Sequence, residues 1–320
     1  GDYAVVLPAD NFPDDGSDDA LIGYWSSGTT IDGTGITSEV TAPDADTDID
    51  DDDNGTLQNA GMFVNAVVSS VVTLGPGTVE PTNEADLSPT GQGALDARAN
   101  MTVDFGFYRL ELGNLVFEDL NNDGVFTGGT DVPLQNVLVQ LFAADGVTEI
   151  ITGADGIPGT ADDGFGPDGI PGNGDDGTGG VLTNASGNYL FRGLAQGDYV
   201  VKATGPTGYT STIDTFDAAD SANPNTNTDN NDNGIGTGAG LTTSAVITLT
   251  PGSAGALNNN TVNQNNGTTT HPTIDFGFVQ VNAGIIKSVT PAQATIGELV
   301  TYTVQISVPP GTFNSAQIVD

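Results

Sequence analysis

Short runs of apolar residues, many with polar residues at alternate positions, recur along the whole chain. They are rich in Val, Ile, Phe and Tyr and are bounded by Gly, Asn, Asp and Pro, which is typical of β-strands between turns. The predicted strands cover residues 112–118, 137–142, 188–194, 199–203, 245–250 and 273–279. No apolar pattern with the period of an α-helix extends over a useful length. The pattern predicts an all-β fold of tandem antiparallel β-sandwich modules, Ig-like or prealbumin-like, with long Asp/Gly/Asn-rich loops.

Sequences near the start of the chain return further along in the same order. They are Gly-Asp-Tyr at 1–3 and 197–199, Gly-Tyr at 23–24 and 208–209, Asp-Asn-Gly at 53–55 and 232–234, Val-Val-Thr-Leu at 71–74 against Val-Ile-Thr-Leu at 246–249, and Val-Asp-Phe-Gly-Phe at 103–107 against Ile-Asp-Phe-Gly-Phe at 274–278. A preserved order indicates a duplicated unit. We expect residues 1–109 (module 1) to lack their opening strands, residues 110–281 (module 2) to be a complete copy, and residues 282–320 to open a further Ig-like stalk module.

The two incomplete ends leave two interpretations open. Either the chain is a window on a longer polypeptide, or neighbouring chains supply the missing strands by strand addition. One of the two is expected, because an open edge would otherwise expose the core of a sandwich.

The composition is strongly acidic, with 42 acidic residues against 5 basic ones and a formal net charge of -37. Asp far outnumbers Glu, and short carboxylates suit loops where one side chain both turns the backbone and binds a hard cation. The charge argues against nucleic acid or an anionic membrane as a partner, because like charges repel. The sequence has no cysteine and no apolar stretch long enough for membrane insertion. We therefore expect several Ca²⁺ ions to hold the loops.

The loop at residues 119–131 has the spacing of a calcium-binding loop. Its candidate ligands are Asp119, Asn121, Asp123, a backbone carbonyl near Val125, and Asp131. Oxygens at alternate positions converge on Ca²⁺ in such loops, and Gly124 permits the sharp turn. The closing carboxylate is displaced by one residue, because Thr130 occupies the usual position. The alternative is a solvated turn between strands.

The longest loop, residues 153–180, contains an internal duplication of Asp-Gly-Ile-Pro-Gly followed by paired Asp residues. The first unit offers Asp155, Asp162 and Asp163 to one ion, and the second offers Asp168, Asp175 and Asp176 to another. The alternative is a disordered acidic linker. We favour calcium binding because the acid spacing and an Ile are repeated in register.

A third pair of acidic segments carries oxygen-bearing side chains at alternate positions. The candidates are Asp44, Asp46, Asp48 and Asp50 in module 1, and Asn225, Asn227 and Asp229 in module 2. Alternate side chains of an extended segment lie on one side of it. Asn supplies a neutral oxygen, so module 2 would bind calcium more weakly here. The alternative is a solvated acidic turn.

The motifs of module 2 carry a family resemblance. They are Leu-Val-Phe-Glu-Asp-Leu-Asn-Asn-Asp-Gly at 115–124, Leu-Gln-Asn-Val-Leu-Val-Gln-Leu at 134–141, and Thr-Asn-Ala-Ser-Gly-Asn-Tyr-Leu-Phe-Arg-Gly-Leu-Ala-Gln-Gly-Asp-Tyr at 183–199. In combination they resemble the SdrD B-like repeat of bacterial surface proteins, a prealbumin-like relative of the collagen-adhesin B-type stalk module. The resemblance covers nearly all of module 2 and, in truncated form, module 1.

The resemblance implies an extracellular, calcium-stiffened β-sandwich that holds an adhesive tip away from the cell envelope. It implies that Asp119, Asn121, Asp123 and Asp131 are the loop ligands, whereas loop 153–180 is outside the common pattern. A related stalk family forms a Lys–Asn isopeptide bond. Here Lys202 follows the second Gly-Asp-Tyr motif instead of lying in the first strand of its module, so we expect calcium in place of that bond.

Catalysis finds little support in the sequence. The single histidine, His271, lies in a turn before a strand, and clustered Asp in Gly-rich loops suits metal coordination better than acid/base chemistry. Trp25 could stack on a sugar, but a lone Trp after Tyr24 is more often a core or edge residue. We do not expect an enzyme.

We expect a structural stalk or fibre segment of a bacterial cell-surface protein or adhesin. Its partners would be neighbouring modules of the same or adjacent chains, and any host ligand would bind regions outside this chain. Two alternatives stay open. One is a filament subunit that polymerises by inter-chain strand complementation, and the other is a carbohydrate- or ligand-binding β-sandwich.

Overall fold

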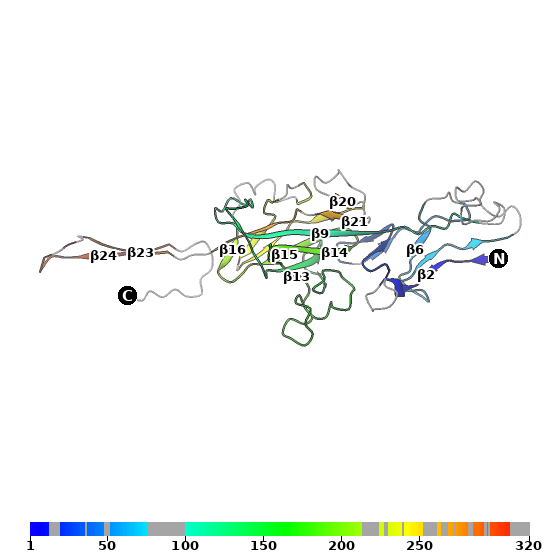
Figure 1. Ribbon diagram of the computed structural model, residues 1–320, viewed down its shortest axis with the longest axis horizontal. Helices are drawn as coiled ribbons and strands as arrows, with labels where there is room; N and C mark the ends of the chain where they lie inside the picture. The colour runs from blue at the N-terminus through cyan, green and yellow to red at the C-terminus, as the bar shows by residue number, and fades with distance from the viewer. Residues whose placement is uncertain are drawn as a thin grey trace.

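The chain is built from β-strands and turns, as the computed structural model in Figure 1 shows. The structure describes residues 1–12, 20–35, 37–47, 52–75, 100–212, 224–226, 230–238, 240–251, 261–263, 268–271, 273–280, 284–290, 293 and 295–307. Helical structure in these residues is confined to two short 3-10 turns, η1 (Ala9–Asn11) and η3 (Pro224–Thr226). The prediction of an all-β fold is confirmed.

Module 2 is a sandwich of two sheets. The first contains β9 (Phe107–Glu118), β10 (Val132–Pro133), β14 (Asn188–Leu194), β16 (Tyr209–Ser211), β20 (Thr261–Asn263), β21 (Thr268–His271) and β22 (Phe276–Gln280). The second contains β11 (Leu138–Ala143), β12 (Glu149–Ile150), β13 (Val181–Leu182), β15 (Gln196–Thr204), β17 (Ile235–Gly238), β18 (Leu241–Thr243) and β19 (Ile247–Leu249). Strand β9 is the hub of the first sheet and β15 that of the second.

Most strand pairs are antiparallel, as predicted, but the first sheet also contains parallel pairs. Strand β14 runs antiparallel to β9, but β21 and β22 both run parallel to it. The reason is topological. The opening strand of module 2 and its closing strand are neighbours, and both run in the same direction along the molecule.

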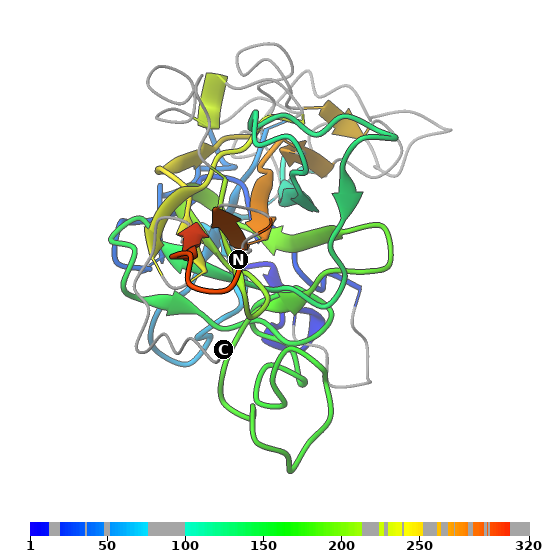
Figure 2. The ribbon, with the colours of Figure 1, turned by 90° about the vertical axis from the view of Figure 1, so that its left-hand side faces the viewer.

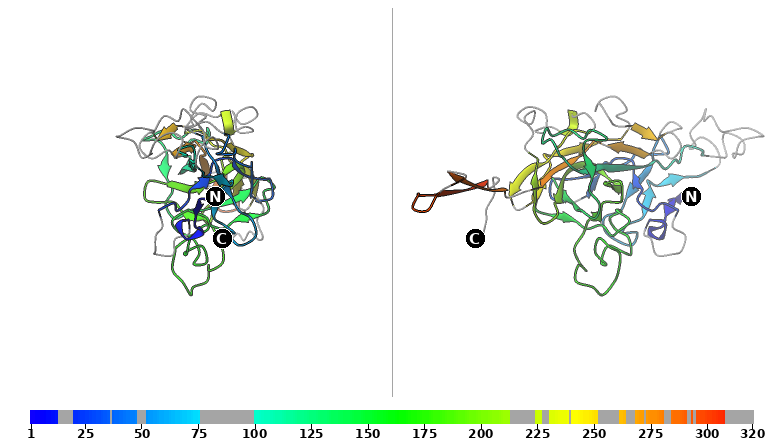
Figure 3. Two further views of the ribbon diagram at one scale, coloured as in Figure 1. Left: turned by 90° about the vertical axis from the view of Figure 1, so that its right-hand side faces the viewer. Right: turned by 60° about the vertical axis from the view of Figure 1, so that its left-hand side comes forward.

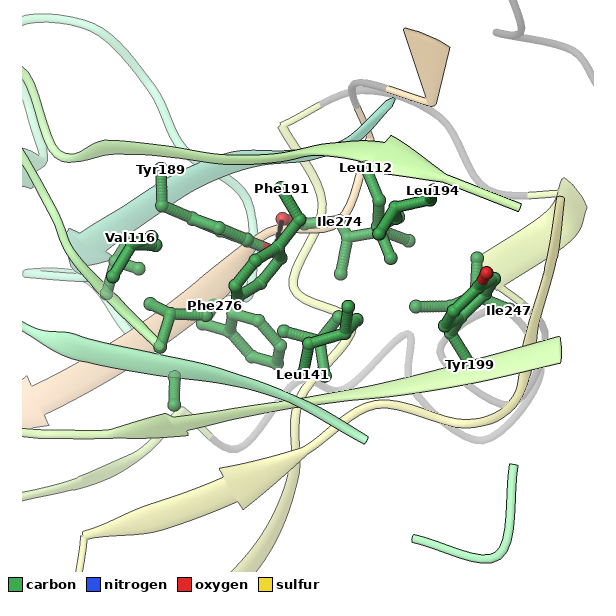
Figure 4. Close-up of a cluster of buried hydrophobic side chains, with 14 of the residues drawn as sticks. Leu112, Val116, Leu141, Tyr189, Phe191, Leu194, Tyr199, Ile247, Ile274 and Phe276 are labelled. Carbon is green, nitrogen blue, oxygen red and sulfur yellow. Dashed lines mark hydrogen bonds between the residues drawn. The ribbon is translucent and has the colours of Figure 1, made fainter. Parts of the chain in front are cut away.

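The core of module 2 lies between the two sheets (Figure 4). Its side chains include Leu112 and Val116 of β9, Leu141 of β11, Tyr189, Phe191 and Leu194 of β14, Tyr199 of β15, Ile247 of β19, and Ile274 and Phe276 near β22. Each of these residues is at most 5% exposed. In β11 and β14, buried residues alternate with more exposed ones, so the alternation in the sequence becomes one buried face per strand.

Module 1 repeats part of this arrangement. Its strands are β1 (Asp2–Tyr3), β2 (Val6–Leu7), β3 (Trp25–Ser26), β4 (Thr29–Ile31), β5 (Thr37–Glu39), β6 (Gly55–Leu57), β7 (Val67–Ser69) and β8 (Val72–Thr73). Strand β1 pairs with β8 as β15 pairs with β19 in module 2. Strand β2 pairs with β7 as β15 pairs with β18. The matching pairs are Asp2 with Thr73 and Asp198 with Thr248, then Val6 with Val68 and Lys202 with Thr243. The repeated sequences therefore pair in the same register.

The molecule is elongated, with Gly1 near one end (Figure 1). At the other end, β23 (Gly284–Thr290) and β24 (Thr301–Ser307) form an antiparallel hairpin that projects from module 2 (Figure 3). Viewed down the long axis, loop 153–180 projects to one side (Figure 2). Within the described residues, no helix has the length and apolar character needed to cross a membrane.

Candidate functional sites: the module junction and the acidic loops

The two modules share one strand. Strand β9 has 12 residues and crosses the predicted boundary between Arg109 and Leu110 without a break. Before the boundary, Phe107 and Tyr108 pair with β3 of module 1. After it, the strand pairs with β14, β10 and β22 of module 2. A hydrogen-bonded strand thus takes the place of a linker.

Side chains and backbone reinforce the junction. The indole N–H of Trp25 in module 1 donates to the carbonyl of Gly193 in module 2 at 2.8 Å. The Tyr108 hydroxyl donates to the carbonyl of Thr29 at 2.5 Å and accepts the backbone N–H of Gln196 at 2.8 Å. Burial raises the pKa of Tyr108 to about 12, so this hydroxyl stays protonated at neutral pH. Strand β4 also adds to β15 as a parallel neighbour.

Two glycines allow the modules to approach closely. A β-bulge between Phe191 and Leu194 contains Gly193, which has a φ of 64°. A Cβ at Gly193 would lie 2.8 Å from the Cα of Gly23 in module 1, and 2.9 Å from a side-chain carbon of Ile157. Any larger residue at either glycine would therefore push the modules apart.

The inserted loop 153–180 braces this junction. The Arg192 guanidinium donates to the carbonyl of Asp155 at 2.9 Å, and the Arg192 backbone N–H donates to the carbonyl of Gly156 at 2.9 Å. These bonds fix the start of the loop to β14, and Ile157 follows directly at the contact with Gly23. The loop is thus attached where the two modules meet.

A cavity of about 420 Å³ also lies at the junction. Its walls include Phe12, Tyr24 and Trp25 of module 1 and Pro158 of loop 153–180. The aromatic residues have structural contacts of their own: Trp25 bonds to module 2, and the Arg109 guanidinium lies 4.7 Å from the centre of the Tyr24 ring. This cavity is the feature that bears on the ligand-binding alternative. Trp25, which could have stacked on a sugar, contacts module 2 and belongs to the junction.

Loop 119–131 buries two of its predicted ligands. Asp119 is 1% exposed and Asp131 is 5% exposed. The Asp119 carboxylate accepts the backbone N–H groups of Asn122 at 2.6 Å and Gly124 at 2.8 Å. The Asp131 carboxylate accepts those of Leu120 at 3.0 Å and Thr127 at 2.7 Å. Buried carboxylates held only by neutral donors are the kind of group that a cation would stabilise.

The other predicted ligands of this loop are also in contact within it. The Asn121 amide donates to one oxygen of Asp123 at 2.7 Å, and the other oxygen accepts the N–H of Val125 at 3.0 Å. Val125 forms an isolated bridge with Asn231. The donors are all oxygens, which suits calcium in kind. Among the described residues, however, no three acidic or histidine side chains are grouped closely enough to hold a metal ion.

The duplicated sequence of loop 153–180 forms duplicated turns. In both units the first Asp accepts the N–H of the following Ile, and the last Asp accepts a glycine N–H. The four bonds are Ile157 to Asp155 at 2.8 Å, Ile170 to Asp168 at 2.9 Å, Gly159 to Asp163 at 2.7 Å and Gly172 to Asp176 at 2.7 Å. Burial raises the pKa of Asp155 and Asp163, and the nearby charge of Asp162 adds to this. Asp175 is half-buried, near Gly166.

The third set of candidates falls partly outside the described residues, where Asp48, Asp50, Asn227 and Asp229 lie. Asp44 accepts the N–H of Asp46 at 3.1 Å. Asp46 accepts the N–H of Thr73 at 2.9 Å, and Asn225 accepts that of Thr248 at 2.8 Å. Asp46 and Asn225 therefore hold equivalent strands, β8 and β19, in the two modules.

The structure adds a site that sequence reasoning missed, which we call the Asn clasp. In module 2, Asn233 and Asp275 bond reciprocally: the Asn233 side-chain oxygen accepts the Asp275 N–H at 2.9 Å, and the Asp275 carbonyl accepts the Asn233 N–H at 2.8 Å. Asn54 and Asp104 make the same two bonds in module 1, both at 2.9 Å. Asn54, Asn233 and Asp275 are fully buried. The sequence contains a signal for this site, because the clasp joins two motifs that are repeated in both modules, Asp-Asn-Gly and Asp-Phe-Gly-Phe.

The chain is similar in sequence to bacterial surface proteins. A stretch of 124 residues is 30% identical to serine-aspartate repeat-containing protein F of Staphylococcus epidermidis, and a stretch of 126 residues is 30% identical to serine-aspartate repeat-containing protein D of Staphylococcus aureus. The predicted resemblance to SdrD B-like repeats is confirmed. Each stretch covers 38% of this chain but only 6% and 7% of those proteins. The matched region thus spans only a small part of those proteins, and no family model matches the chain.

Solved structures with partial likeness are pilins. The minor pilin GBS52 of Streptococcus agalactiae is 16% identical, with a TM-score of 0.28 over 63% of this chain and 65% of that one. The major pilin SpaD of Corynebacterium diphtheriae is also 16% identical, with a TM-score of 0.26 over 63% of this chain and 38% of that one. Because these TM-scores are low, the description of the two modules rests on their own strand topology.

Proposed function

We propose that the chain is a non-enzymatic structural segment of a bacterial extracellular surface protein, a stalk or fibre whose modules are joined end to end without a hinge. The observation that carries this proposal is the continuity of β9 through both modules. Domains joined by a flexible linker normally move relative to each other. Here a bend would break ladder hydrogen bonds of β9 together with the bonds of Trp25 and Tyr108.

The order of the strands also suits a protein under tension. Load that reaches module 2 through β9 leaves it through β22, which is the neighbour of β9 and parallel to it. Pulling the two strands apart along their length loads their hydrogen bonds together instead of one after another. Resistance to forced unfolding depends on the unfolding rate, and this arrangement keeps that rate low.

The rigid junction is tested by inserting Gly-Ser-Gly-Ser between Arg109 and Leu110. The chain has no cysteine, so spin labels are placed through Met62→Cys in module 1 and Val147→Cys in module 2, which are 86% and 80% exposed. Pulsed electron paramagnetic resonance then gives the distribution of the distance between the labels. We expect a narrow distribution in the parent chain and a broad one after the insertion.

The matched control carries the same insertion between Gly172 and Asn173, at an exposed position of loop 153–180. It lengthens the chain equally but leaves β9 intact, so its distribution should stay narrow. A broad distribution already present in the parent chain would contradict the proposal.

We further propose that the acidic loops bind calcium and that the bound ions stiffen the modules. Support comes from the oxygen-only ligand set, the buried carboxylates of Asp119 and Asp131, and the net charge of -37. Bound calcium would neutralise these carboxylates and tie each loop to its flanking strands. At millimolar calcium, a site with a dissociation constant of about 0.1 to 1 mM stabilises the folded state by roughly 0.4 to 1.4 kcal/mol. Several such sites approach the net stability of a small domain.

Thermal melting with millimolar calcium, and with an excess of chelator, tests this part. We expect calcium to raise the melting temperature and Asp119→Asn to reduce the rise. Asp145→Asn, in an exposed turn outside the acidic loops, should leave the rise unchanged. If chelator has no effect on melting, the calcium part is wrong, while the rigid junction stays a separate question.

A further inference from the structure

Both Asn clasps contain the dipeptide Asn-Gly, at residues 54–55 and 233–234. An Asn before Gly deamidates readily, because glycine has no side chain to keep its backbone nitrogen away from the Asn side-chain carbonyl. The nitrogen forms a bond to Cγ, the Cγ–Nδ2 bond breaks, and ammonia leaves with the proton of the glycine nitrogen. Water then opens the succinimide ring at one carbonyl or the other, which gives aspartate or isoaspartate. The clasps are therefore built on amides that can react.

The folded structure of module 2 holds the reacting groups in other contacts. The Asn233 side-chain oxygen accepts the N–H of Asp275 at 2.9 Å, and the N–H of Gly234 donates to the Asp232 carboxylate at 2.9 Å. Asn233 is also fully buried, whereas the reaction needs water to finish. The amide is therefore protected as long as module 2 stays closed.

Module 1 protects its dipeptide in the same way. The Asn54 side-chain oxygen accepts the N–H of Asp104 at 2.9 Å, and the N–H of Gly55 donates to the Asp53 carboxylate at 2.9 Å. Asn54 is fully buried. The same two bonds thus hold the reacting groups in both modules.

The packing around the two glycines leaves no room for an isoaspartate product. A Cβ at Gly234 would clash with the hydroxyl of Thr242. A Cβ at Gly55 would lie 2.6 Å from a ring carbon of Phe105 and 2.7 Å from a side-chain carbon of Val67. Isoaspartate lengthens the backbone by a methylene group directly before the glycine. Neither glycine could then keep its place, because a closely packed interior does not yield by that much.

Either product also places a carboxylate where the clasp has a neutral amide. In module 2, Asp232 and Asp275 are already fully buried next to Asn233. Among the described residues, the Asn233 side-chain nitrogen has no hydrogen-bond partner, so no donor is in place for the oxygen that would replace it. In module 1, burial raises the pKa of Asp53, and the nearby charge of Asp104 adds to this. A further buried carboxylate is therefore costly in both clasps.

We propose that Asn54 and Asn233 are modification sites that record the opening of their modules: each deamidates only while its module is open, and the product prevents the clasp from closing again. The proposal goes beyond the stalk function and depends neither on it nor on calcium. It requires only local opening, which folded proteins undergo spontaneously and which load would favour. The fraction of intact clasps then falls with the total time that a module has spent open.

The dipeptide Asn173–Gly174 in loop 153–180 provides an internal control, because both of its residues are exposed. The full chain is incubated at mildly alkaline pH, with and without enough guanidinium chloride to unfold it. Peptide mapping by mass spectrometry then gives the deamidated fraction of each Asn. In the folded chain, Asn173 should react faster than Asn54 and Asn233 by about tenfold or more, because the clasps react only from the open state. In the unfolded chain, all three should react at similar rates.

Two matched variants test whether the product keeps the clasp open. Asn233→Asp should lower the denaturant midpoint, and by less at acid pH, where the new carboxyl group is neutral. Asn173→Asp makes the same change of charge at an exposed position and should leave the midpoint unchanged. If Asn233→Asp does not fold, parent chains deamidated in denaturant and returned to buffer replace it, and hydrogen exchange at the Asp275 amide reports the clasp.

Two results would overturn the proposal. One is deamidation of Asn54 and Asn233 in the folded chain as fast as that of Asn173. The other is a chain that carries aspartate or isoaspartate at position 233 and still has the midpoint and the Asp275 amide protection of the parent.

Discussion

Modules 1 and 2 have the same strand registers and the same Asn clasp but differ sharply in how well their equivalent residues are buried. The clasp bonds agree to within 0.1 Å, at 2.9 Å in module 1 and at 2.9 and 2.8 Å in module 2. Tyr3 and Tyr199, by contrast, are 58% and 1% exposed. Local sequence thus specifies strand pairing and turn contacts, whereas burial depends on the neighbouring strands, such as β11 beside Tyr199 in module 2. Because burial provides most of the stabilising free energy, the modules should respond differently to the same change.

The largest expected difference comes from the equivalent tyrosines. Tyr199→Ala removes a buried ring from the core of module 2 and should lower the free energy of unfolding by about 3 to 5 kcal/mol. Tyr3→Ala removes a mostly exposed ring and should lower it by less than about 1 kcal/mol. Urea unfolding followed by circular dichroism measures both. Equal losses would contradict the difference in burial between the two tyrosines.

The Asn clasp should behave in the opposite way and give similar losses in both modules. Asn233→Leu leaves the buried N–H of Asp275 without its acceptor, which costs about 1 to 3 kcal/mol. Asn54→Leu removes the acceptor of the N–H of Asp104, which is half-buried, and should cost a similar amount. Hydrogen exchange at the Asp104 and Asp275 amides reports each clasp separately. A loss confined to module 2 would show that the clasp depends on a complete core.

A smaller effect is expected at the contact between the modules. Trp25→Phe keeps an aromatic ring but removes the N–H that bonds to Gly193, so it should lower stability by about 0.5 to 1.5 kcal/mol. The amides around Gly193 should exchange faster, while those of the Asn clasps should not change. If the clasps also loosened, the junction and the modules would be one cooperative unit.

The smallest expected effect is a dependence of stability on pH without metal. Burial raises the pKa of Glu39 and Asp53 in module 1, and of Glu111, Asp155 and Asp163 in module 2. A carboxyl whose pKa is raised on folding binds its proton more tightly in the folded state, so it contributes stability at low pH that is lost as pH rises through the folded pKa. In chelator, the melting temperature should therefore rise as the pH falls from neutral towards about 4.5.

Repeating the pH series of melting temperatures with added calcium gives a second test. If the ions occupy the acidic loops, added calcium should raise the melting temperature more at neutral pH than at pH 4.5, because protons compete for the same carboxylates. A melting temperature that falls steadily with acid in chelator would contradict the pKa directions given above.

The sequence predicts local structure well wherever one face of a strand is apolar. The segment 188–194 coincides with β14, and 137–142 is displaced by one residue from β11. Matched motifs also predict the equivalent strands of the two modules. These features depend on alternation and turn chemistry, which operate over a few residues.

Contacts between distant segments could not be predicted in this way. The repeat places a boundary between Arg109 and Leu110, but whether a strand continues there depends on its partners in both modules. Parallel pairing of β9 with β22, and the bond from Trp25 to Gly193, join residues far apart in sequence. The spacing around Asp46 predicts a metal ligand, but its contact with the N–H of Thr73 depends on the fold and could not be predicted from spacing.

The shared strand also has a consequence for symmetry. Since β9 belongs to both modules, it fixes their rotation about the long axis as well as their separation. An array built by repeating this junction would therefore be a screw, with the same turn and rise at every step. Loops equivalent to 153–180 would then follow a regular spiral along the outside of the rod, so that side projections are presented at set angles and set heights.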